Sequence, residues 1–168
     1  TSPLTIVGKT AYFGAVQGFS YLYSVDIVTG KTNWRFKAED RIGAAPDVNA
    51  QTVSALSYDG FIYTVSLDAG KELRKKLLSG ESMTAILKNG RVYYWKLNRE
   101  DGAGNLMARD IENSRAYLSA TVPNPVGLPP RIAGSQLYLW NNTGSLYTIS
   151  QDAEDAPLQL LTFNPAAH

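Results

Sequence analysis

Apolar and polar residues alternate along short segments of the chain, and tight turns separate these segments. The clearest example is residues 21–36, in which two strand-like stretches with a two-residue period flank a polar turn. Gly30 can adopt a positive φ in this turn, and Asp26 can accept hydrogen bonds from its backbone. The stretch therefore predicts a β-hairpin that carries Trp34 and Phe36 on one face of its second strand.

The same pattern returns at regular intervals along the chain. Segments that match the stretch beginning at Leu22 begin at Ile62, Leu106 and Leu146, which are shifts of 40, 44 and 40 residues. Spacings near forty in segments of short strands are typical of β-propeller blades. We predict an all-β protein, a β-propeller of about four four-stranded antiparallel blades. These blades should form a single domain over residues 1–168, because an isolated blade leaves both faces exposed.

The repeat also predicts where each blade lies. The four blades should span approximately residues 2–37, 43–78, 82–122 and 128–163. Residues 82–88 also fit helical spacing, but the register of the repeat favours a strand. The turns at one end of the blades are short, whereas the connections at the other end are longer and more varied: residues 15–20, 38–42, 98–105 and 123–130.

Charge and composition exclude several classes of function. The chain has 16 basic and 15 acidic residues and a net charge of +1, which argues against a nucleic-acid or anionic-membrane surface. It has no cysteine and one histidine, His168 in the expected tail, so thiolate chemistry and histidine-based triads or zinc sites are not expected. No apolar run is long enough for a membrane-spanning helix. Because the sequence begins at Thr1 without a signal-like segment, we expect a processed chain or a piece of a longer one.

The first hairpin carries a recognisable motif. Asp26, Gly30, Lys31 and Trp34 follow the spacing Ala-x-Asp-x-x-x-Gly-Lys-x-x-Trp, with Ser24 in place of the alanine. This resembles the structural docking motif of the PQQ-type β-propeller repeat family, which includes quinoprotein dehydrogenases and BamB-like proteins. The resemblance covers nearly the whole chain, and it implies that Trp34 docks against a neighbouring blade.

The later repeats keep less of the motif. The second repeat keeps Gly70 and Lys71, and the third keeps Ala108 and Asp110. The fourth repeat keeps none of the motif residues. The residues therefore do not predict a regular ring of docked tryptophans.

The resemblance implies a fold more firmly than it implies a cofactor. Quinoprotein dehydrogenases of this family surround PQQ with eight blades, bind Ca²⁺, and in many cases use a cysteine pair, whereas this chain has four repeats and no cysteine. We therefore expect neither PQQ nor Ca²⁺ to bind, and we predict no catalytic, cofactor-binding or metal-binding residues. Four blades are half of an eight-bladed propeller, so the exposed end blades also predict self-association.

Three functions remain open at this stage. The favoured one is a non-catalytic binding or scaffolding propeller that contacts a protein partner, and the resemblance implies a periplasmic or extracellular location. The first alternative is a fragment of a PQQ-dependent quinoprotein dehydrogenase. The second is a carbohydrate- or ligand-binding propeller that uses an aromatic rim. Trp95 and Trp140 end equivalent strands, and we expect them to pack neighbouring blades. The alternative is that they line a shared surface for a partner, because tryptophan is enriched at binding hot spots.

The longer connections predict where a partner would bind. Loops on a rigid scaffold concentrate recognition residues, and mixed charge favours specific protein contact over a polyanion. The candidate partner face comprises Glu39, Asp40, Arg41, Arg99, Glu100 and Asp101. The alternative is that these are ordinary solvated loops. Lys75 and Lys76 are interpreted as part of a solvated outer strand, apart from this face.

Overall fold

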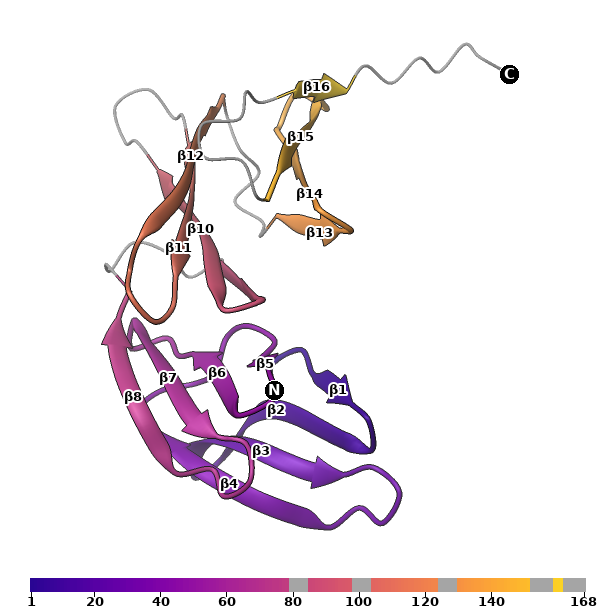
Figure 1. The fold of residues 1–168 in the computed structure, drawn as a ribbon, viewed down its shortest axis with the longest axis vertical. Helices are drawn as coiled ribbons and strands as arrows, with labels where there is room; N and C mark the ends of the chain where they lie inside the picture. The colour runs from indigo at the N-terminus through magenta and orange to yellow at the C-terminus, as the bar shows by residue number, and fades with distance from the viewer. Residues whose placement is uncertain (79–84, 98–103, 124–129, 152–158, 162–168) are drawn as a thin grey trace. The chain divides into compact units, whose positions relative to one another are not determined.

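Short strands joined by tight turns form four separate antiparallel sheets (Figure 1). The computed structural model describes residues 1–78, 85–97, 104–123, 130–151 and 159–161. Within these residues all regular secondary structure is β, and each sheet has four strands in sequence order. The predicted fold class, a β-propeller of four-stranded antiparallel blades, is confirmed, with four blades present.

Each sheet is one blade. Blade one comprises β1 (Thr5–Val7), β2 (Thr10–Gln17), β3 (Phe19–Asp26) and β4 (Thr32–Ala38). Blade two comprises β5 (Asp47–Val48), β6 (Thr52–Leu56), β7 (Phe61–Ser66) and β8 (Glu72–Leu77). Blade three comprises β9 (Ala85–Lys88), β10 (Arg91–Leu97), β11 (Gly104–Asp110) and β12 (Ala116–Val122). Blade four comprises β13 (Arg131–Ala133), β14 (Gln136–Trp140), β15 (Leu146–Ser150) and β16 (Gln159–Leu161).

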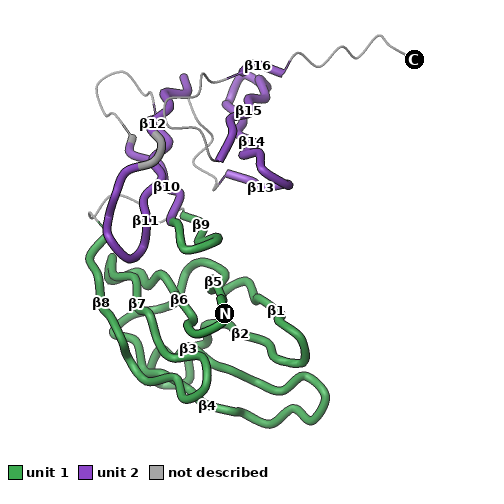
Figure 2. Tube along the Cα trace, viewed as in Figure 1, with its two compact units in different colours: residues 1–91 green, residues 92–168 purple. Residues whose placement is uncertain are grey.

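The chain divides into two compact units, residues 1–91 and 92–168 (Figure 2). The first unit contains blades one and two, and its core lies between their facing sides. Whether the 168 residues act as a single domain remains a prediction. In the second unit the buried side chains come mainly from β10, β11, β14 and β15, and the Tyr93 hydroxyl donates to the side-chain carbonyl of Gln151 at 3.4 Å.

Several predicted connections and strand limits are wrong. The expected loop at residues 15–20 does not exist, because β2 and β3 pair as far as Gln17 and Phe19 and only Gly18 separates them. Gly18 makes this tight reversal with a φ of +72°. Gly104 and Asn105 belong to β11 rather than to a loop. Residues 98–103 and 124–129 of the other two long connections lie outside the described residues, whereas residues 85–88 form the expected strand.

One tryptophan joins the first two blades. Trp34 in β4 is 8% exposed, and its indole N–H donates to the backbone carbonyl of Leu67 at 2.8 Å. The indole lies over Gly70 in the β7–β8 turn, where an added Cβ would come within 2.5 Å of the ring. Tyr12 packs beside it, with ring centroids 6.0 Å apart. The burial and docking that the sequence implies for Trp34 are both observed.

The packing around this tryptophan leads to a first prediction. Replacing Trp34 with alanine removes a buried indole and leaves the Leu67 carbonyl without its donor, so the free energy of unfolding should fall by about 3–5 kcal/mol. Thr32→Ala, at an exposed position of the same strand, is the matched control and should change it by less than about 0.5 kcal/mol. Urea unfolding followed by circular dichroism measures both, and equal effects of the two substitutions would contradict the docking role.

Candidate functional site

The turn after β3 shows what the docking motif does locally. The Asp26 carboxylate accepts hydrogen bonds from the backbone N–H groups of Thr29 at 2.7 Å and Val28 at 2.9 Å, and from the Thr29 hydroxyl at 3.0 Å. Gly30 closes the turn with a φ of +70°. The hydrogen bonds from Thr29, with a smaller one from Val28, hold the pKa of Asp26 below its ordinary value of 3.8. Asp26 therefore organises its own turn, which is a common role of aspartate at such positions.

The third repeat builds the same turn from different residues. The Asp110 carboxylate accepts hydrogen bonds from the backbone N–H groups of Glu112 at 2.7 Å and Asn113 at 2.8 Å. Ser114 occupies the position of Gly30 and also adopts a positive φ, of 65°. These acidic residues are satisfied within their own turns, so the motif is a structural device in both repeats.

The connection between blades one and two is held rigidly. It follows β4 and pairs with the turn between β6 and β7 through a bridge between Ile42 and Ser57. The backbone N–H of Tyr58 donates to the carbonyl of Arg41 at 2.8 Å, and the Ser57 hydroxyl donates to the carbonyl of Asp40 at 2.9 Å. We call residues 39–43 and 57–59 together the crossover face. Its backbone is tied at several points, so its side chains project from a fixed frame.

Two solvent-exposed side chains of the crossover face contact each other. The guanidinium of Arg41 lies 4.9 Å from the ring centroid of Tyr58, and Tyr58 is 39% exposed. Asp40 accepts a hydrogen bond from the backbone N–H of Arg41 at 2.6 Å, and its carboxylate lies 4.0 Å from the Arg41 Nε. Arg41, Ile42 and Tyr58, together with residues 14–16, line a pocket of about 110 Å³.

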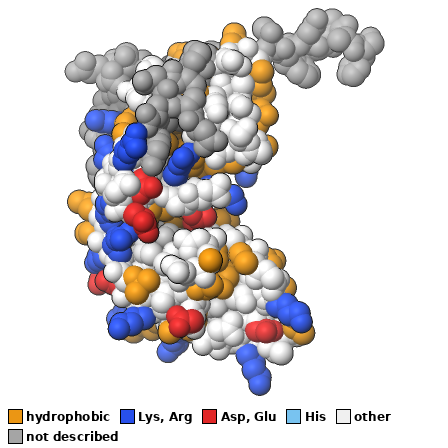
Figure 3. Space-filling view, viewed as in Figure 1, with side chains coloured by type: hydrophobic (Ala, Val, Ile, Leu, Met, Phe, Trp, Pro, Cys, Tyr) orange, Lys and Arg blue, Asp and Glu red, His pale blue; other side chains and the backbone are white. Residues whose placement is uncertain are grey.

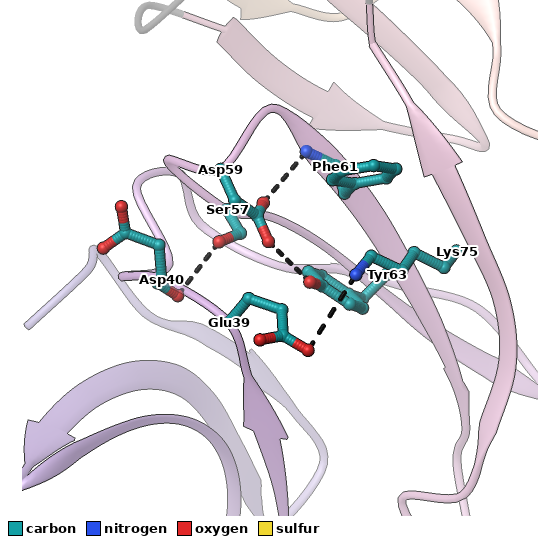
Figure 4. Close-up of polar contacts among 7 residues, drawn as sticks. All are labelled: Glu39, Asp40, Ser57, Asp59, Phe61, Tyr63 and Lys75. Carbon is teal, nitrogen blue, oxygen red and sulfur yellow. Dashed lines mark hydrogen bonds and ion pairs between the residues drawn. The ribbon is translucent and has the colours of Figure 1, made fainter.

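Beside the crossover, a second group of polar side chains surrounds the buried ring of Tyr63 (Figure 4). The Tyr63 hydroxyl donates to Asp59 at 2.5 Å, and burial first, then Asp59, raises the pKa of Tyr63 well above its ordinary value of 10. Lys75 extends over the rings of Phe61 and Tyr63, at 4.5 and 5.2 Å from their centroids. Its ammonium group lies 4.0 Å from the carboxylate of Glu39.

The structure brings together half of the predicted partner face. Glu39, Asp40 and Arg41 follow one another in the crossover, whereas Arg99, Glu100 and Asp101 lie outside the described residues. Lys75 lies in β8, the outer strand of blade two, and is exposed, as the sequence predicts. It is not apart from the predicted partner face, however, because β7–β8 pairing sets it opposite Tyr63 and its long side chain reaches Glu39.

Sequence reasoning missed three contributors to this region. Ser57, Tyr58 and Asp59 are absent from the predicted partner face. The sequence Tyr58-Asp59-Gly60 is typical of a short turn between two strands, and that signal could have found them.

Trp95 cannot form the aromatic rim that a carbohydrate-binding propeller would need. Its side chain is 3% exposed, within the core of the second unit. Trp140, the other candidate, is half-buried in β14. The burial of Trp95 agrees with the expectation that it packs inside the propeller and rules out the alternative of a shared binding surface at this residue, because a buried indole is not available to a ligand.

Two further observations concern the residues that the structure describes. They include no group of three or more histidine, aspartate or glutamate side chains that could hold a metal ion. They also include no helix of the length and apolar character needed to cross a membrane. The expectation that neither PQQ nor Ca²⁺ binds remains a prediction.

Comparison with known proteins places the chain in a family. The sequence profile of the family described as outer membrane protein assembly factor BamB matches residues 2–125. The chain belongs to this BamB family of PQQ-type repeats. The comparison with curated protein sequences found no match.

Solved structures agree with the fold of the BamB family. BamB from Moraxella catarrhalis is 18% identical with a TM-score of 0.61, and the match covers 90% of this chain and 46% of BamB. The quinohemoprotein alcohol dehydrogenase from Comamonas testosteroni is 13% identical with a TM-score of 0.62, covering 96% of this chain and 34% of the enzyme. The computationally designed Ika4 protein is 14% identical with a TM-score of 0.60, covering 89% of each chain. The chain thus spans less than half the length of the two natural proteins.

The turn at Asp26 leads to a pH-dependent prediction. Because its folded pKa is lowered, the stability that Asp26 contributes is present above its unfolded pKa and is lost as the pH falls through the folded value. Asp26→Ala should therefore lower the free energy of unfolding at neutral pH. Below pH 3.8, the difference in this free energy between the variant and the parent chain should become smaller. Asp26→Asn keeps an acceptor without a charge and is the control. Carboxyl titration by NMR and urea unfolding across the pH range measure the effect; a titration midpoint above 3.8 would contradict it.

Proposed function

We propose that this chain is part of a non-catalytic binding or scaffolding propeller and that the crossover face contacts its protein partner. The observation that carries the proposal is the exposed pair of Arg41 and Tyr58 on a backbone that is hydrogen-bonded in place. Arginine and tyrosine are among the residues most enriched at the centres of protein interfaces. A face that is ordered before binding loses little conformational freedom when a partner docks.

The charges of the crossover face support a protein rather than a polyanion as partner. Glu39 and Asp40 lie beside Arg41 in the crossover, and Lys75 lies beside Glu39. A mixture of signs favours a partner with complementary charges over a uniformly charged one. The small pocket next to Arg41 has room for a side chain of that partner.

Family membership supports an extracytoplasmic setting for this binding role. The family is described as an outer membrane protein assembly factor, and the solved BamB structure shares the fold. The chain spans 46% of that BamB, so we propose a protein partner and an extracytoplasmic location for this part of the protein.

A fragment of a quinoprotein dehydrogenase is the second candidate, because quinohemoprotein alcohol dehydrogenase shares the fold over 96% of this chain. Addition of PQQ and Ca²⁺ with an artificial electron-accepting dye tests it directly. We expect no dye reduction with alcohol substrates above the level of PQQ alone. Protein-dependent reduction would instead favour the dehydrogenase.

Site-specific crosslinking tests the partner face. A photoreactive phenylalanine analogue placed at Tyr58 should crosslink to a defined partner in cells of the native host, whereas the same analogue at Lys9 should not. Lys9 is the matched position because it is exposed and lies in the β1–β2 turn, at the other end of blade one. Arg41→Glu should reduce crosslinking from position 58 by about tenfold, since it reverses a charge at the centre of the face.

The control for this charge reversal is Lys9→Glu, which changes the net charge by the same amount. It should leave crosslinking from position 58 unchanged. If both reversals lower crosslinking equally, the effect is one of net charge, and the crossover face is not the partner site.

A further inference from the structure

The first turn of blade three is fastened to the inner strand of blade two. The Asp47 carboxylate in β5 accepts a hydrogen bond from the backbone N–H of Gly90 at 2.7 Å and another from that of Asn89 at 3.2 Å. All three residues belong to the first unit, which ends at residue 91. The two N–H groups of one tight turn therefore meet the two oxygens of one carboxylate, and this contact holds the turn against β5.

An asparagine occupies a position of this turn that glycine takes in two other blades. Gly8 and Gly134 begin the corresponding turns of blades one and four, with φ values of 59° and 58°. Asn89 adopts a φ of 53° at this position, and Gly90 follows with 73°. Glycine adopts such values without strain, so the shape of the turn does not depend on the carboxamide of Asn89.

The pair Asn89-Gly90 has a chemistry of its own. Asn89 is the only asparagine in the sequence that precedes a glycine. The backbone nitrogen after an asparagine can attack its side-chain carboxamide, and a glycine there has no Cβ to hinder the approach. Asn89 is exposed, and nothing described beyond the chain neighbours of Gly90 lies within 4 Å of a Cβ added there. Water and the space for a five-membered ring are therefore available.

The asparagine in the corresponding turn of blade two is protected in two ways. Asn49 precedes Ala50, whose Cβ stands beside the nitrogen that would attack. Its side-chain carbonyl also accepts hydrogen bonds from the backbone N–H groups of Gln51 at 2.9 Å and Thr52 at 2.8 Å, which hold the carboxamide in place. Asn49 is exposed, as Asn89 is, so the two turns differ in chemistry rather than in access to water.

We propose that Asn89 is a site of deamidation and that Asp47 restrains the reaction. The backbone nitrogen of Gly90 forms a bond to Cγ of Asn89, and the bond between Cγ and Nδ2 breaks. The Gly90 nitrogen loses its proton and ammonia leaves, which gives a succinimide ring. Water then adds to one of the two ring carbonyls and opens the ring to aspartate or isoaspartate at position 89.

Asp47 opposes this reaction in two ways. Its hydrogen bond directs the Gly90 N–H toward β5, so the turn must open before the nitrogen can reach Cγ of Asn89. Its negative charge also disfavours loss of the proton from the adjacent nitrogen, because like charges repel. Acidic and basic side chains are interspersed on the face of the first unit that Figure 3 presents, so no patch of one sign dominates there.

Deamidation would loosen the contact between blade two and the first turn of blade three. Isoaspartate adds one carbon atom to the main chain between residues 89 and 90, so the two N–H groups would no longer match the two oxygens of Asp47. Aspartate keeps the backbone unchanged but brings a second carboxylate close to that of Asp47. Asn89 thus links the age of the chain to the strength of one contact, independently of the crossover face.

Peptide mass spectrometry tests the site. The folded chain is kept in mildly alkaline buffer and sampled over time, and isoaspartate is labelled by an isoaspartyl carboxyl methyltransferase. Conversion at Asn89 should exceed that at Asn49 by at least about tenfold, because Gly90 lacks the Cβ that Ala50 carries. Asn89→Gly, which suits the positive φ, should abolish methyl labelling of this turn. Equal conversion at the two asparagines would overturn the proposal.

Two aspartate substitutions test the restraint. Asp47→Ala should speed conversion at Asn89 by at least about threefold, since the turn opens more often without its acceptor. Asp68→Ala removes the same charge from an exposed position of the β7–β8 turn and should leave the rate unchanged. Asn49 in the same samples reports general unfolding. An equal rise at Asn49 and Asn89 would overturn the role of Asp47, and so would an unchanged or slower rate at Asn89 in Asp47→Ala.

Discussion

The contact between one indole and one turn determines how the first two blades are arranged. Because the Trp34 N–H donates to Leu67 and the ring needs the bare surface of Gly70, β4 must lie across the β7–β8 turn. The connection from β4 to β5 follows this contact, and its residue Ile42 pairs with Ser57 in the β6–β7 turn. The charged residues of the crossover face are therefore positioned by a hydrophobic contact at the far end of the same strand.

The fold could be predicted from the sequence because spacing and turn chemistry agree. Segments near forty residues apart, the Asp26 turn and the exposed-to-buried alternation around Leu22 all indicate blades, and the structure has four of them. The limits of the strands were less predictable. The sequence predicts a loop at residues 15–20, but a single glycine with positive φ, Gly18, is enough to reverse the chain, so the strands extend to both sides of it.

The candidate site was predictable only in part, because its members come from different strand ends. The run Glu39 to Arg41 is visible as a charged segment, whereas Tyr58 joins it through a backbone bridge that no local pattern encodes. Lys75 joins it for a different reason: cross-strand pairing sets its aliphatic stem over Tyr63, so the ammonium emerges next to Glu39. Trp95 is buried, as expected, although it lies near the end of its strand.

Ser114 shows how a repeat can lose its signature and keep its shape. A serine with a φ of 65° is held there by a turn in which the Asp110 carboxylate accepts two backbone hydrogen bonds and Asn113 accepts one more from Arg115. The hydrogen-bond acceptors of Asp110 and Asn113, rather than a glycine, thus stabilise this turn. They offset the backbone strain of a positive φ at a non-glycine residue. The glycine and the tryptophan of a blade can consequently be replaced one at a time during evolution. Divergent blades then lose their recognisable sequence motif well before their architecture changes.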